Sequence, residues 1–309
     1  MAAAASVAEY HSRDFDWDEL REEVESDPCL AYHLTPSAPV SCSSSSSPSL
    51  SPCEADAWRS FHRRHSSGKF FKERRYLLEE FPELARCDGF AKVLEVGCGN
   101  GSTVLPILRA KQSMIIYACD CSPEVLERAK EIISSANGIS SEERFHPFLL
   151  DFSVNNFPKW LFCSSCQNAL VRNQSSSSED AAEKLMTRDE LDFRTNTQCC
   201  IGGVDFVTLI FTLSAVPLQN MPFVLAQCFS ALKPGCLLLF RDYGLYDMTM
   251  LRFPVKQKVG DREYMRLDGT LSYFFSLDIV RDLFVSAGFI ELELEYCCLD
   301  TGIRIELWT

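Results

Sequence analysis

Apolar positions follow two alternating patterns through the middle and end of the chain. Short apolar runs typical of buried strands are separated by segments whose apolar residues recur at helical spacing, and this alternation indicates a parallel sheet with helical crossovers. The predicted strands are Ala91–Val96, Met114–Cys119, Phe145–Leu150, Val204–Leu213 and Cys236–Arg241. The predicted helices are Ser102–Ala110, Glu124–Ala136, Met221–Leu232 and Leu277–Ala287. We therefore predict an α/β fold with a mostly parallel sheet and helices on both faces.

The last part of the chain alternates with period two rather than in a helical pattern. Ile290–Cys298 and Ile303–Trp308 read as a pair of strands that closes the sheet, joined around Asp300-Thr301-Gly302. Lys233-Pro234-Gly235 predicts a turn before the fifth strand. The two closing strands bring the expected sheet to seven strands.

Two regions lack a pattern that can form a core. Residues 1–57 are acidic and Ser/Pro-rich, so we predict a disordered N-terminal extension in which only Asp16–Glu25 can form a helix. Residues 160–203 interrupt the strand–helix order and include the low-complexity run Ser175–Asp180. We predict a surface insertion there, within a domain that covers residues 91–309.

Residues 58–90 return to helical patterning and form a basic, aromatic segment. Trp58, Phe61 and His62 fall on one helical face. Residues 58–75 carry seven basic residues against the single acidic residue Glu73. Aromatic rings interleaved with Arg and Lys suit RNA, because bases stack on rings and guanidinium planes. An amphipathic helix that covers the core with a solvated basic side explains the pattern equally well.

Composition narrows the class of protein. The chain has 309 residues and a formal net charge of −13, but a local basic segment matters more to a phosphate backbone than the total does. No apolar run approaches the roughly 20 residues of a membrane span. The N-terminus resembles neither a secretory signal nor an Arg-rich transit peptide, so we expect a cytoplasmic or nuclear protein whose 15 cysteines stay reduced.

A glycine-rich sequence, Glu95-Val96-Gly97-Cys98-Gly99-Asn100-Gly101, ends the first predicted strand. Glycine lets a ligand approach bare backbone, and the N-terminus of the following helix presents N–H groups to it. The third glycine comes one residue too early for the dinucleotide fingerprint G-x-G-x-x-G. The form E-x-G-x-G-x-G instead resembles motif I of the S-adenosylmethionine (SAM) methyltransferases, although a plain strand–helix turn can carry the same glycines.

Acidic residues stand at the ends of the next two predicted strands, where open α/β sheets bind their ligands. Asp120 follows the second strand, and its carboxylate can accept hydrogen bonds from both ribose hydroxyls of SAM. Asp151-Phe152 follows the third strand and suits adenine with its exocyclic amine. An acid at a strand end can instead cap a helix, but the ordered series favours SAM as the cofactor.

Cysteine spacing in the insertion raises a metal site as an alternative. Cys163-x-x-Cys166 followed by Cys199-Cys200 can supply four thiolates for zinc. The second pair is adjacent, however, and adjacent cysteines fit zinc-ribbon spacing poorly. The sequence therefore favours a surface insertion without a metal.

Several longer motifs together resemble one family, the tRNA 3-methylcytidine (m3C) methyltransferases of the methyltransferase-like group, nearest its serine-tRNA branch. The likeness covers about residues 58–298 apart from the insertion. It implies a class I Rossmann-like fold with a seven-stranded sheet, and transfer of the SAM methyl to N3 of cytosine 32 in the anticodon loop. The matching stretches are Phe70–Arg74, Val96–Gly101, Ala118–Pro123, Leu209–Val216, Leu239–Met250 and Asp268–Phe275.

The resemblance also assigns roles to residues. Catalysis is mostly positioning, because N3 already carries a lone pair, with Asp242 on the cytosine edge, Tyr243 or Phe211 stacked on the base, and Arg241 orienting a carboxylate or contacting phosphate. A loop held by its own Arg241–Asp242 pair is the structural alternative. The implied SAM-binding residues are Trp58, His62, Gly97, Gly99, Asp120, Asp151, Phe152 and Ile210, and the implied RNA-binding residues are Arg63, Arg64, Lys69, Lys72 and Arg74.

The chain departs from the family pattern at three places. His62 stands where the family usually has tyrosine, the 160–203 insertion is extra, and the end at Thr309 replaces a longer final strand. The implied partners are tRNA and a synthetase such as seryl-tRNA synthetase, with no membrane. Two rival hypotheses remain: a SAM enzyme that acts on a protein or small molecule, and a SAM-binding partner without catalytic activity.

Overall fold

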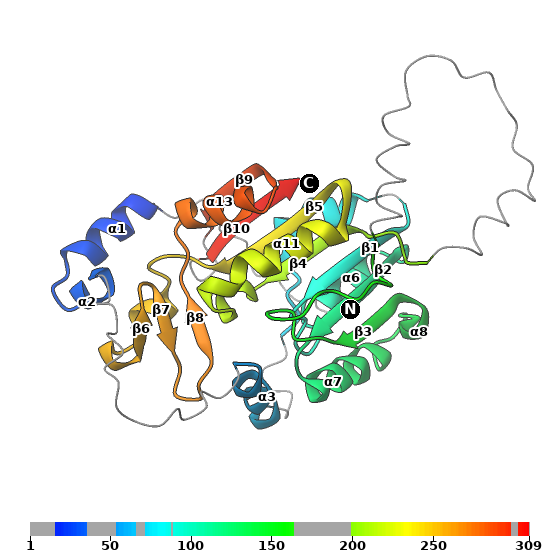
Figure 1. Cartoon of the computed structure of the whole chain (residues 1–309), viewed down its shortest axis with the longest axis horizontal. Helices are drawn as coiled ribbons and strands as arrows, with labels where there is room; N and C mark the ends of the chain where they lie inside the picture. The colour runs from blue at the N-terminus through cyan, green and yellow to red at the C-terminus, as the bar shows by residue number, and fades with distance from the viewer. Residues whose placement is uncertain are drawn as a thin grey trace, which may run out of the picture.

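The computed structural model describes residues 16–35, 54–65, 72–87, 89–163 and 199–297, and the backbone of residues 302–308. A large twisted sheet flanked by helices forms the body of the protein, and a smaller sheet lies beside it (Figure 1). Most of the predicted 160–203 insertion, together with Lys69 and Cys166, lies outside the described residues.

The large sheet has the strand order β3-β2-β1-β4-β5-β10-β9. Strands β1 to β5 run parallel to one another, and β10 is antiparallel to both β5 and β9. The five parallel strands confirm the predicted α/β class. The strands are β1 (Ala91–Val96), β2 (Met114–Asp120), β3 (Phe145–Leu149), β4 (Val204–Ile210), β5 (Leu232–Tyr243), β9 (Ile290–Cys297) and β10 (Gly302–Trp308).

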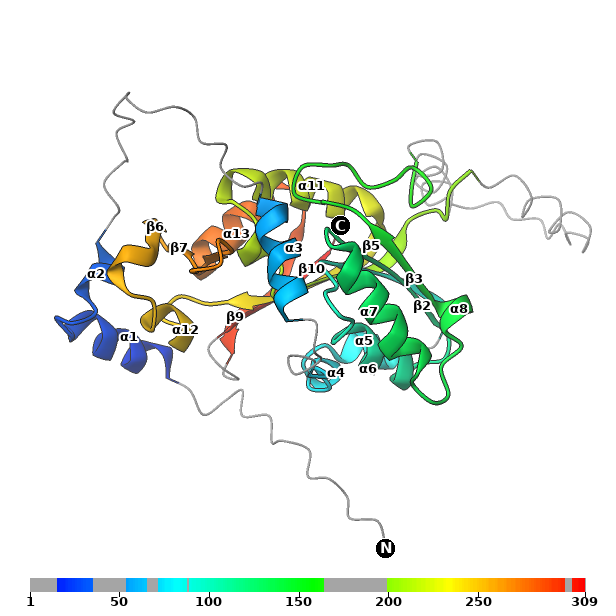
Figure 2. The ribbon, with the colours of Figure 1, turned by 90° about the horizontal axis from the view of Figure 1, so that it is seen from below.

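Helices cover both faces of this sheet, as predicted (Figure 2). Neighbouring residues of β1 point to opposite faces, so Val93 packs in one core and Leu94 in the other, and both are fully buried. Helices α11 (Met221–Ala231) and α13 (Leu277–Ser286) cover the Leu94 face. The helices that cover the Val93 face are α4 (Leu77–Glu80), α5 (Pro82–Arg86), α6 (Val104–Ala110) and α7 (Pro123–Ser134), with α8 (Ser141–Arg144) leading into β3.

The predicted turn at Lys233-Pro234-Gly235 is part of a strand instead. Strand β5 already begins at Leu232, which pairs with Val204. Its register against β4 then shifts, and the next partners are Phe206 and Leu237. Gly235, with a φ of 74°, lies in this irregular part of the strand. The turn-forming residues therefore make a bulge and do not separate α11 from the strand.

A second, antiparallel sheet was not predicted from the sequence. It consists of β6 (Lys258–Gly260), β7 (Glu263–Met265) and β8 (Leu271–Tyr273). This sheet has a small hydrophobic core, separate from the cores of the large sheet. It is formed by Met250 of α12 (Met248–Leu251), Phe253, Tyr264 and Phe274.

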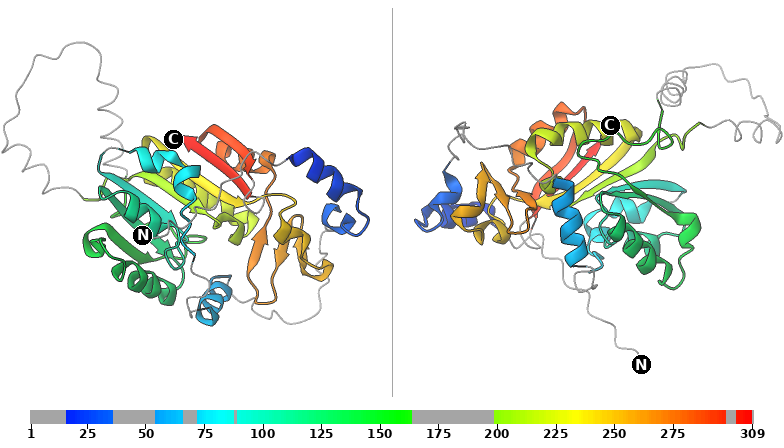
Figure 3. Two further views of the ribbon diagram at one scale, coloured as in Figure 1. Left: turned by 180° about the vertical axis from the view of Figure 1, so that it is seen from behind. Right: turned by 60° about the horizontal axis from the view of Figure 1, so that its bottom comes forward.

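The N-terminal segment packs on this small sheet (Figure 3). Helices α1 (Trp17–Ser26) and α2 (Ala31–Leu34) precede it in the chain. The Tyr32 hydroxyl donates to the Phe253 carbonyl at 2.5 Å, and the Tyr264 hydroxyl lies 2.7 Å from Nδ1 of the buried His33. Helix α1 agrees with the helix expected over Asp16–Glu25, whereas α2 and its packing contacts differ from the disorder predicted for the rest of residues 16–35.

Helix α3 (Glu54–Arg64) lies across the ends of the parallel strands (Figure 2). It begins before the predicted domain boundary at residue 58. Within the described residues, no helix has both the length and the apolar character that crossing a membrane requires.

Candidate functional site: a cavity at the strand ends

A cavity of about 310 Å³ opens at the carboxyl ends of β1, β2 and β4. Its floor is the glycine loop after β1, and α3 covers one side. The predicted SAM-binding residues all line it: Trp58, His62, Gly97, Gly99, Asp120, Asp151, Phe152 and Ile210. The structure thus brings together residues spread over more than 150 positions, at the edge where such sheets bind ligands.

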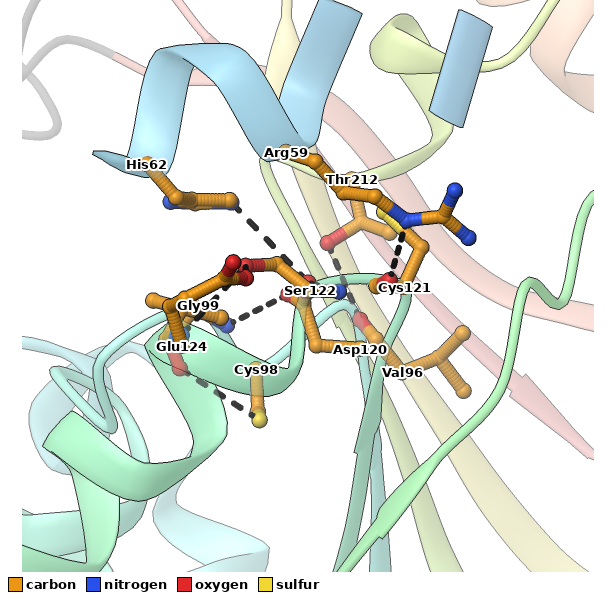
Figure 4. Close-up of polar contacts among 11 residues, drawn as sticks. Arg59, His62, Val96, Cys98, Gly99, Asp120, Cys121, Ser122, Glu124 and Thr212 are labelled. Atoms are coloured by element: carbon orange, nitrogen blue, oxygen red, sulfur yellow. Dashed lines mark hydrogen bonds and ion pairs between the residues drawn. The ribbon is translucent and has the colours of Figure 1, made fainter. Parts of the chain in front are cut away.

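Two glycines of the loop after β1 differ in the space around them: Gly97 packs closely against Thr212, whereas Gly99 faces open space. Gly97 has a φ of 69°, and a Cβ atom there would come within 2.5 Å of Thr212 Cγ2. Gly99 has a φ of 52°, and a Cβ atom on it would meet nothing within 4 Å. The Thr212 hydroxyl donates to the Val96 carbonyl at 3.0 Å and so ties the end of β1 to the loop after β4 (Figure 4).

Asp120 is held in place by backbone donors on two sides (Figure 4). Its Oδ2 accepts from the Gly99 N–H at 3.0 Å, and its Oδ1 accepts from the Ser122 N–H at 3.0 Å. The residue is 5% exposed and lines the cavity. A carboxylate oxygen has more than one lone pair, so Asp120 can still accept hydrogen bonds from a ligand.

Helix α3 reaches the same carboxylate from above. His62 Nε2 lies 3.9 Å from Asp120 Oδ1, and Arg59 Nε donates to the Cys121 carbonyl at 3.0 Å (Figure 4). Burial lowers the pKa of His62, and the carboxylates of Asp120 and Glu124 partly oppose that shift. The helix therefore presents a neutral imidazole to the cavity at pH 7.

Two features of the cavity wall suit SAM. The indole N–H of Trp58 is buried and has no hydrogen-bond partner in the described part of the chain, so it remains available to a ligand. Asp151 and Phe152 lie together after β3, and Asp151 Oδ1 accepts from the backbone and the hydroxyl of Ser153. This donor and acceptor set fits a charged, nucleoside-containing cofactor.

Glu95 is an acid of the glycine motif to which the sequence assigned no function. It is buried, lines the cavity and accepts from the Thr208 hydroxyl. Desolvation raises its pKa to about 7, despite hydrogen bonds that favour its ionised form. Glu95 therefore titrates near neutral pH at the edge of the site, and the E-x-G-x-G-x-G pattern is the sequence signal that pointed to it.

Arg241 has surroundings that the sequence did not predict. The side chain is fully buried and forms an ion pair with the equally buried Glu80 of α4. Its guanidinium also lies 5.2 Å from the centre of the Tyr76 ring. Of the two expected contacts of Arg241, the one with a carboxylate is made by Glu80, whereas the one with phosphate has no support because Arg241 is buried and is absent from the described lining of the cavity.

Asp242 is buried as well and also lies outside the cavity lining. Its Oδ2 accepts from the Ser214 N–H and its Oδ1 from the Tyr243 N–H, both at 2.9 Å. Burial raises its pKa to about 6. These bonds fix the turn after β4 and the end of β5, whereas the expected contact with a cytosine edge finds no support in this geometry.

The aromatic residues of this region do approach the cavity. Phe211, which lines it, has a φ of 53°, and such strain in a non-glycine residue often marks a functional site. Its ring centre lies 5.0 Å from that of Tyr243, and the Arg74 guanidinium lies 4.6 Å from the same ring centre. Phe211 and Arg74 thus form an aromatic and cationic rim.

The remaining predicted RNA-binding residues lie mostly on the surface. Arg63 and Arg64 are exposed at the end of α3, and Arg64 lies 3.7 Å from Asp268 of the loop between β7 and β8. Lys72 is exposed, and Lys69 lies outside the described residues. Arg74 differs from them because its Nε donates to the Ser102 hydroxyl at 3.3 Å beside the glycine loop.

Comparison with known proteins supplies the family. The sequence profile described as "Methyltransferase domain" matches residues 61–293. The chain is 35% identical over 248 residues to the human tRNA N(3)-cytidine methyltransferase METTL6, covering 79% of this chain and 72% of that protein. The chain belongs to the tRNA N(3)-cytidine methyltransferase family. The family resemblance seen in the motifs is thereby confirmed, and SAM is the methyl donor of this methyltransferase fold.

Other comparisons agree with this assignment. The tRNA N(3)-methylcytidine methyltransferase Mettl2 of Drosophila melanogaster is 33% identical over 245 residues, covering 77% of this methyltransferase and 62% of that protein. A solved structure of a Burkholderia thailandensis 1,6-didemethyltoxoflavin-N1-methyltransferase superposes with a TM-score of 0.53 at 13% identity, covering 86% of this chain and 93% of that one. The structural match shows that the methyltransferase fold is shared.

Proposed function

We propose that this protein transfers the methyl group of SAM to N3 of a cytidine in tRNA. The observation that carries the proposal is the cavity in which the Asp120 carboxylate stands beside the Gly97–Gly101 loop, in a chain of this family. Asp120 accepts hydrogen bonds from the ribose hydroxyls, and Asp151 with Phe152 receives the adenine. Trp58, His62 and Ile210 close around the cofactor.

The chemistry requires positioning more than proton transfer. SAM supplies an electrophilic methyl on a sulfonium centre, and cytosine N3 carries a lone pair at neutral pH. The residues of the chain therefore act by holding the base in line with the methyl and by excluding water. We assign Phe211 to stacking on the cytosine, with Tyr243 behind it as support. Asp242 is a positioning residue, because its hydrogen bonds fix Tyr243 and the turn that follows Phe211.

The target base must leave its stack before N3 is accessible, since N3 lies on the Watson–Crick edge. An unpaired loop makes this step easier than a duplex does. We therefore propose the anticodon loop, at position 32, with Arg63, Arg64, Lys69, Lys72 and Arg74 holding phosphates. Serine tRNAs are the proposed substrates, seryl-tRNA synthetase is the proposed partner, and the cytoplasm, with the nucleus as a second compartment, is the proposed location.

Incubation with methyl-labelled SAM and total tRNA, followed by digestion to nucleosides, tests the activity directly. We expect label in 3-methylcytidine, and serine tRNA carrying U instead of C at position 32 should receive none. The variant Asp120→Asn should bind SAM about 10- to 100-fold more weakly, because it loses a charge-assisted acceptor worth about 1.5–3 kcal/mol. Asp278→Asn, a change on helix α13, is the control. Label in another nucleoside, or in added protein, would refute the proposal.

Charge reversal tests the RNA-binding residues separately. The double variant Arg63→Glu/Arg64→Glu should weaken tRNA binding. The slope of log binding constant against log salt concentration should also become shallower, by about 0.7–0.9 for each phosphate that is no longer neutralised. The control variant Lys130→Glu/Arg281→Glu, which makes the same total change of charge on α7 and α13, should leave tRNA affinity unchanged. If both double variants bind tRNA equally well, α3 does not contact the RNA. Adding seryl-tRNA synthetase to the same binding assay tests the proposed partner.

A further inference from the structure

Three cysteine side chains converge at the base of the insertion. Cys163 precedes the 164–198 segment, and Cys199 and Cys200 follow it. The Cys163 and Cys199 sulfurs lie 3.2 Å apart, the Cys163 and Cys200 sulfurs 3.6 Å apart, and all three lie within 4.8 Å of one another. The adjacent pair that fits zinc-ribbon spacing poorly in the sequence thus meets Cys163 in space.

These separations are close to those that one bound metal ion requires. Zinc takes thiolates at about 2.3 Å in a tetrahedron, which puts neighbouring sulfurs about 3.8 Å apart. Soft thiolate ligands in tetrahedral arrangement favour zinc over the hard cations. Cys166 lies outside the described residues, and Cys163, Cys199 and Cys200 supply three of the four ligands that such a site takes.

A hydrogen-bond donor and a cation lie beside the cysteines. The Gly202 N–H lies 3.4 Å from Cys200 Sγ and donates to it. The Lys92 ammonium donates at 2.6 Å to the carbonyl of Ile201, the residue after Cys200. An N–H donor and a cation near the sulfurs suit the thiolate ligands of a zinc site.

The main chain brings the cysteines together independently of any ligand. The Ile201 N–H donates to the Trp160 carbonyl at 2.8 Å, and the Gly203 N–H donates to the Leu161 carbonyl at 3.0 Å. These two bonds hold the entry and exit of the 164–198 segment side by side. Leu161 and Val204, which flank the cysteines, belong to the main core. The cluster is therefore part of the fold of the domain.

We propose that Cys163, Cys199 and Cys200 bind a zinc ion that fastens both ends of the 164–198 segment to the sheet. Each thiol releases its proton to solvent as its sulfur binds the metal, and no oxidation state changes. Because β4 begins at Val204 and ends beside the cavity at Ile210 and Phe211, the ion anchors the strand that carries these residues. The site is structural and separate from methyl transfer.

Metal analysis of the full chain tests the proposal. The protein, prepared in reducing buffer with ZnCl2 and freed of excess metal, should carry about one zinc per chain by plasma mass spectrometry. The variant Cys199→Ser, which changes an exposed residue, and Cys163→Ser should each lose most of this zinc. Cys29→Ser, also exposed but on the N-terminal segment, should keep it. A wild-type protein without zinc, or variants that retain it, would overturn the proposal.

Cobalt substitution tests the coordination without any variant that might fail to fold. Wild-type protein loaded with Co²⁺ should show thiolate-to-cobalt charge transfer and the strong visible bands of tetrahedral cobalt, which added zinc should abolish. Absence of these bands overturns the proposal. A disulfide between Cys163 and either Cys199 or Cys200 in zinc-free protein as isolated, located by peptide mapping under non-reducing conditions, would also overturn it. Chelation of the bound zinc should lower the melting temperature.

Discussion

His62 on α3 lies 3.9 Å from Asp120, the carboxylate that the end of β2 presents to the cavity. The two side chains come from parts of the chain that share no strand or helix. At neutral pH the histidine is uncharged, because burial lowers its pKa. Protonation would convert this approach into an ion pair, so α3 and the cofactor would then compete for Asp120.

SAM binding should consequently weaken as the solution becomes acidic. Because the pKa of His62 is lowered, SAM affinity should fall at a pH below the usual histidine pKa of about 6.5. For one linked proton, the affinity falls by at most about tenfold per pH unit. Calorimetry from pH 7.5 to 5 should show the loss in wild type and in the control His146→Gln. His62→Tyr, which introduces the residue usual in the family, should remove that part of the pH dependence. An identical profile in His62→Tyr would assign the effect to another group.

Glu95 should make the protein less stable as pH rises towards 8. Its folded pKa of about 7 is above the unfolded value, so the folded state binds the extra proton, and stability present at pH 4 is lost as pH passes through 7. Glu95→Gln should remove this loss, a gain on the order of 3 kcal/mol at pH 8 and little at pH 5. Urea titrations at both pH values measure it, with the exposed Glu127→Gln as control. A gain of equal size at both pH values would contradict the assignment.

The buried pair of Arg241 and Glu80 should act on stability rather than on methyl transfer. Arg241→Met leaves a buried carboxylate without its cation and should cost about 3–5 kcal/mol in urea unfolding. The double variant Arg241→Met/Glu80→Leu should recover most of that loss. The pair of Arg109 and Glu73 is the control, because Arg109 is exposed and Glu73 keeps Arg75 as a second partner, so Arg109→Met should cost less than about 1 kcal/mol. Lost activity in Arg241→Met with unchanged stability would instead show contact with substrate.

Gly97→Ala should distort the floor of the cavity. Both Gly97 and Gly138 have positive φ, so alanine at either position costs about 1–2 kcal/mol of backbone strain. At Gly97 alone the new methyl group would also collide with Thr212. We expect Gly97→Ala to lower the melting temperature and SAM affinity more than Gly138→Ala. Adding Thr212→Ala to Gly97→Ala should restore part of the melting temperature and part of the SAM affinity. If it restores neither, the collision with Thr212 is not the cause of the losses.

The sequence predicted the parallel strands well because their signals are local, and the residues that it proposed for SAM meet in one cavity. Strand β1 matches its predicted bounds, and the other parallel strands agree to within a few residues at most ends. The glycine loop and Asp120 lie within 24 residues of one another, and the strand–loop–helix geometry fixes their relation.

The features that the sequence missed depend on distant contacts. Strands β6 to β8 have three residues each, too few for an alternation to be recognised. The partner of Arg241 is Glu80, 161 positions earlier. The sequence raised Cys163, Cys199 and Cys200 as possible thiolate ligands, but their meeting depends on main-chain bonds between residues 160–161 and 201–203. Spacing along the chain does not show such contacts.

The packing of Trp17 also determines an order of events during synthesis. Its ring stacks on Tyr296 with centroids 4.8 Å apart and planes 5° apart, and on Tyr246 at 5.9 Å. Ribosomes release the N-terminus first, so α1 emerges long before strand β9 supplies Tyr296. Helix α1 is thus among the first elements made and among the last to dock. Through most of translation its tryptophan is an exposed aromatic surface, available to the chaperones that attend nascent chains.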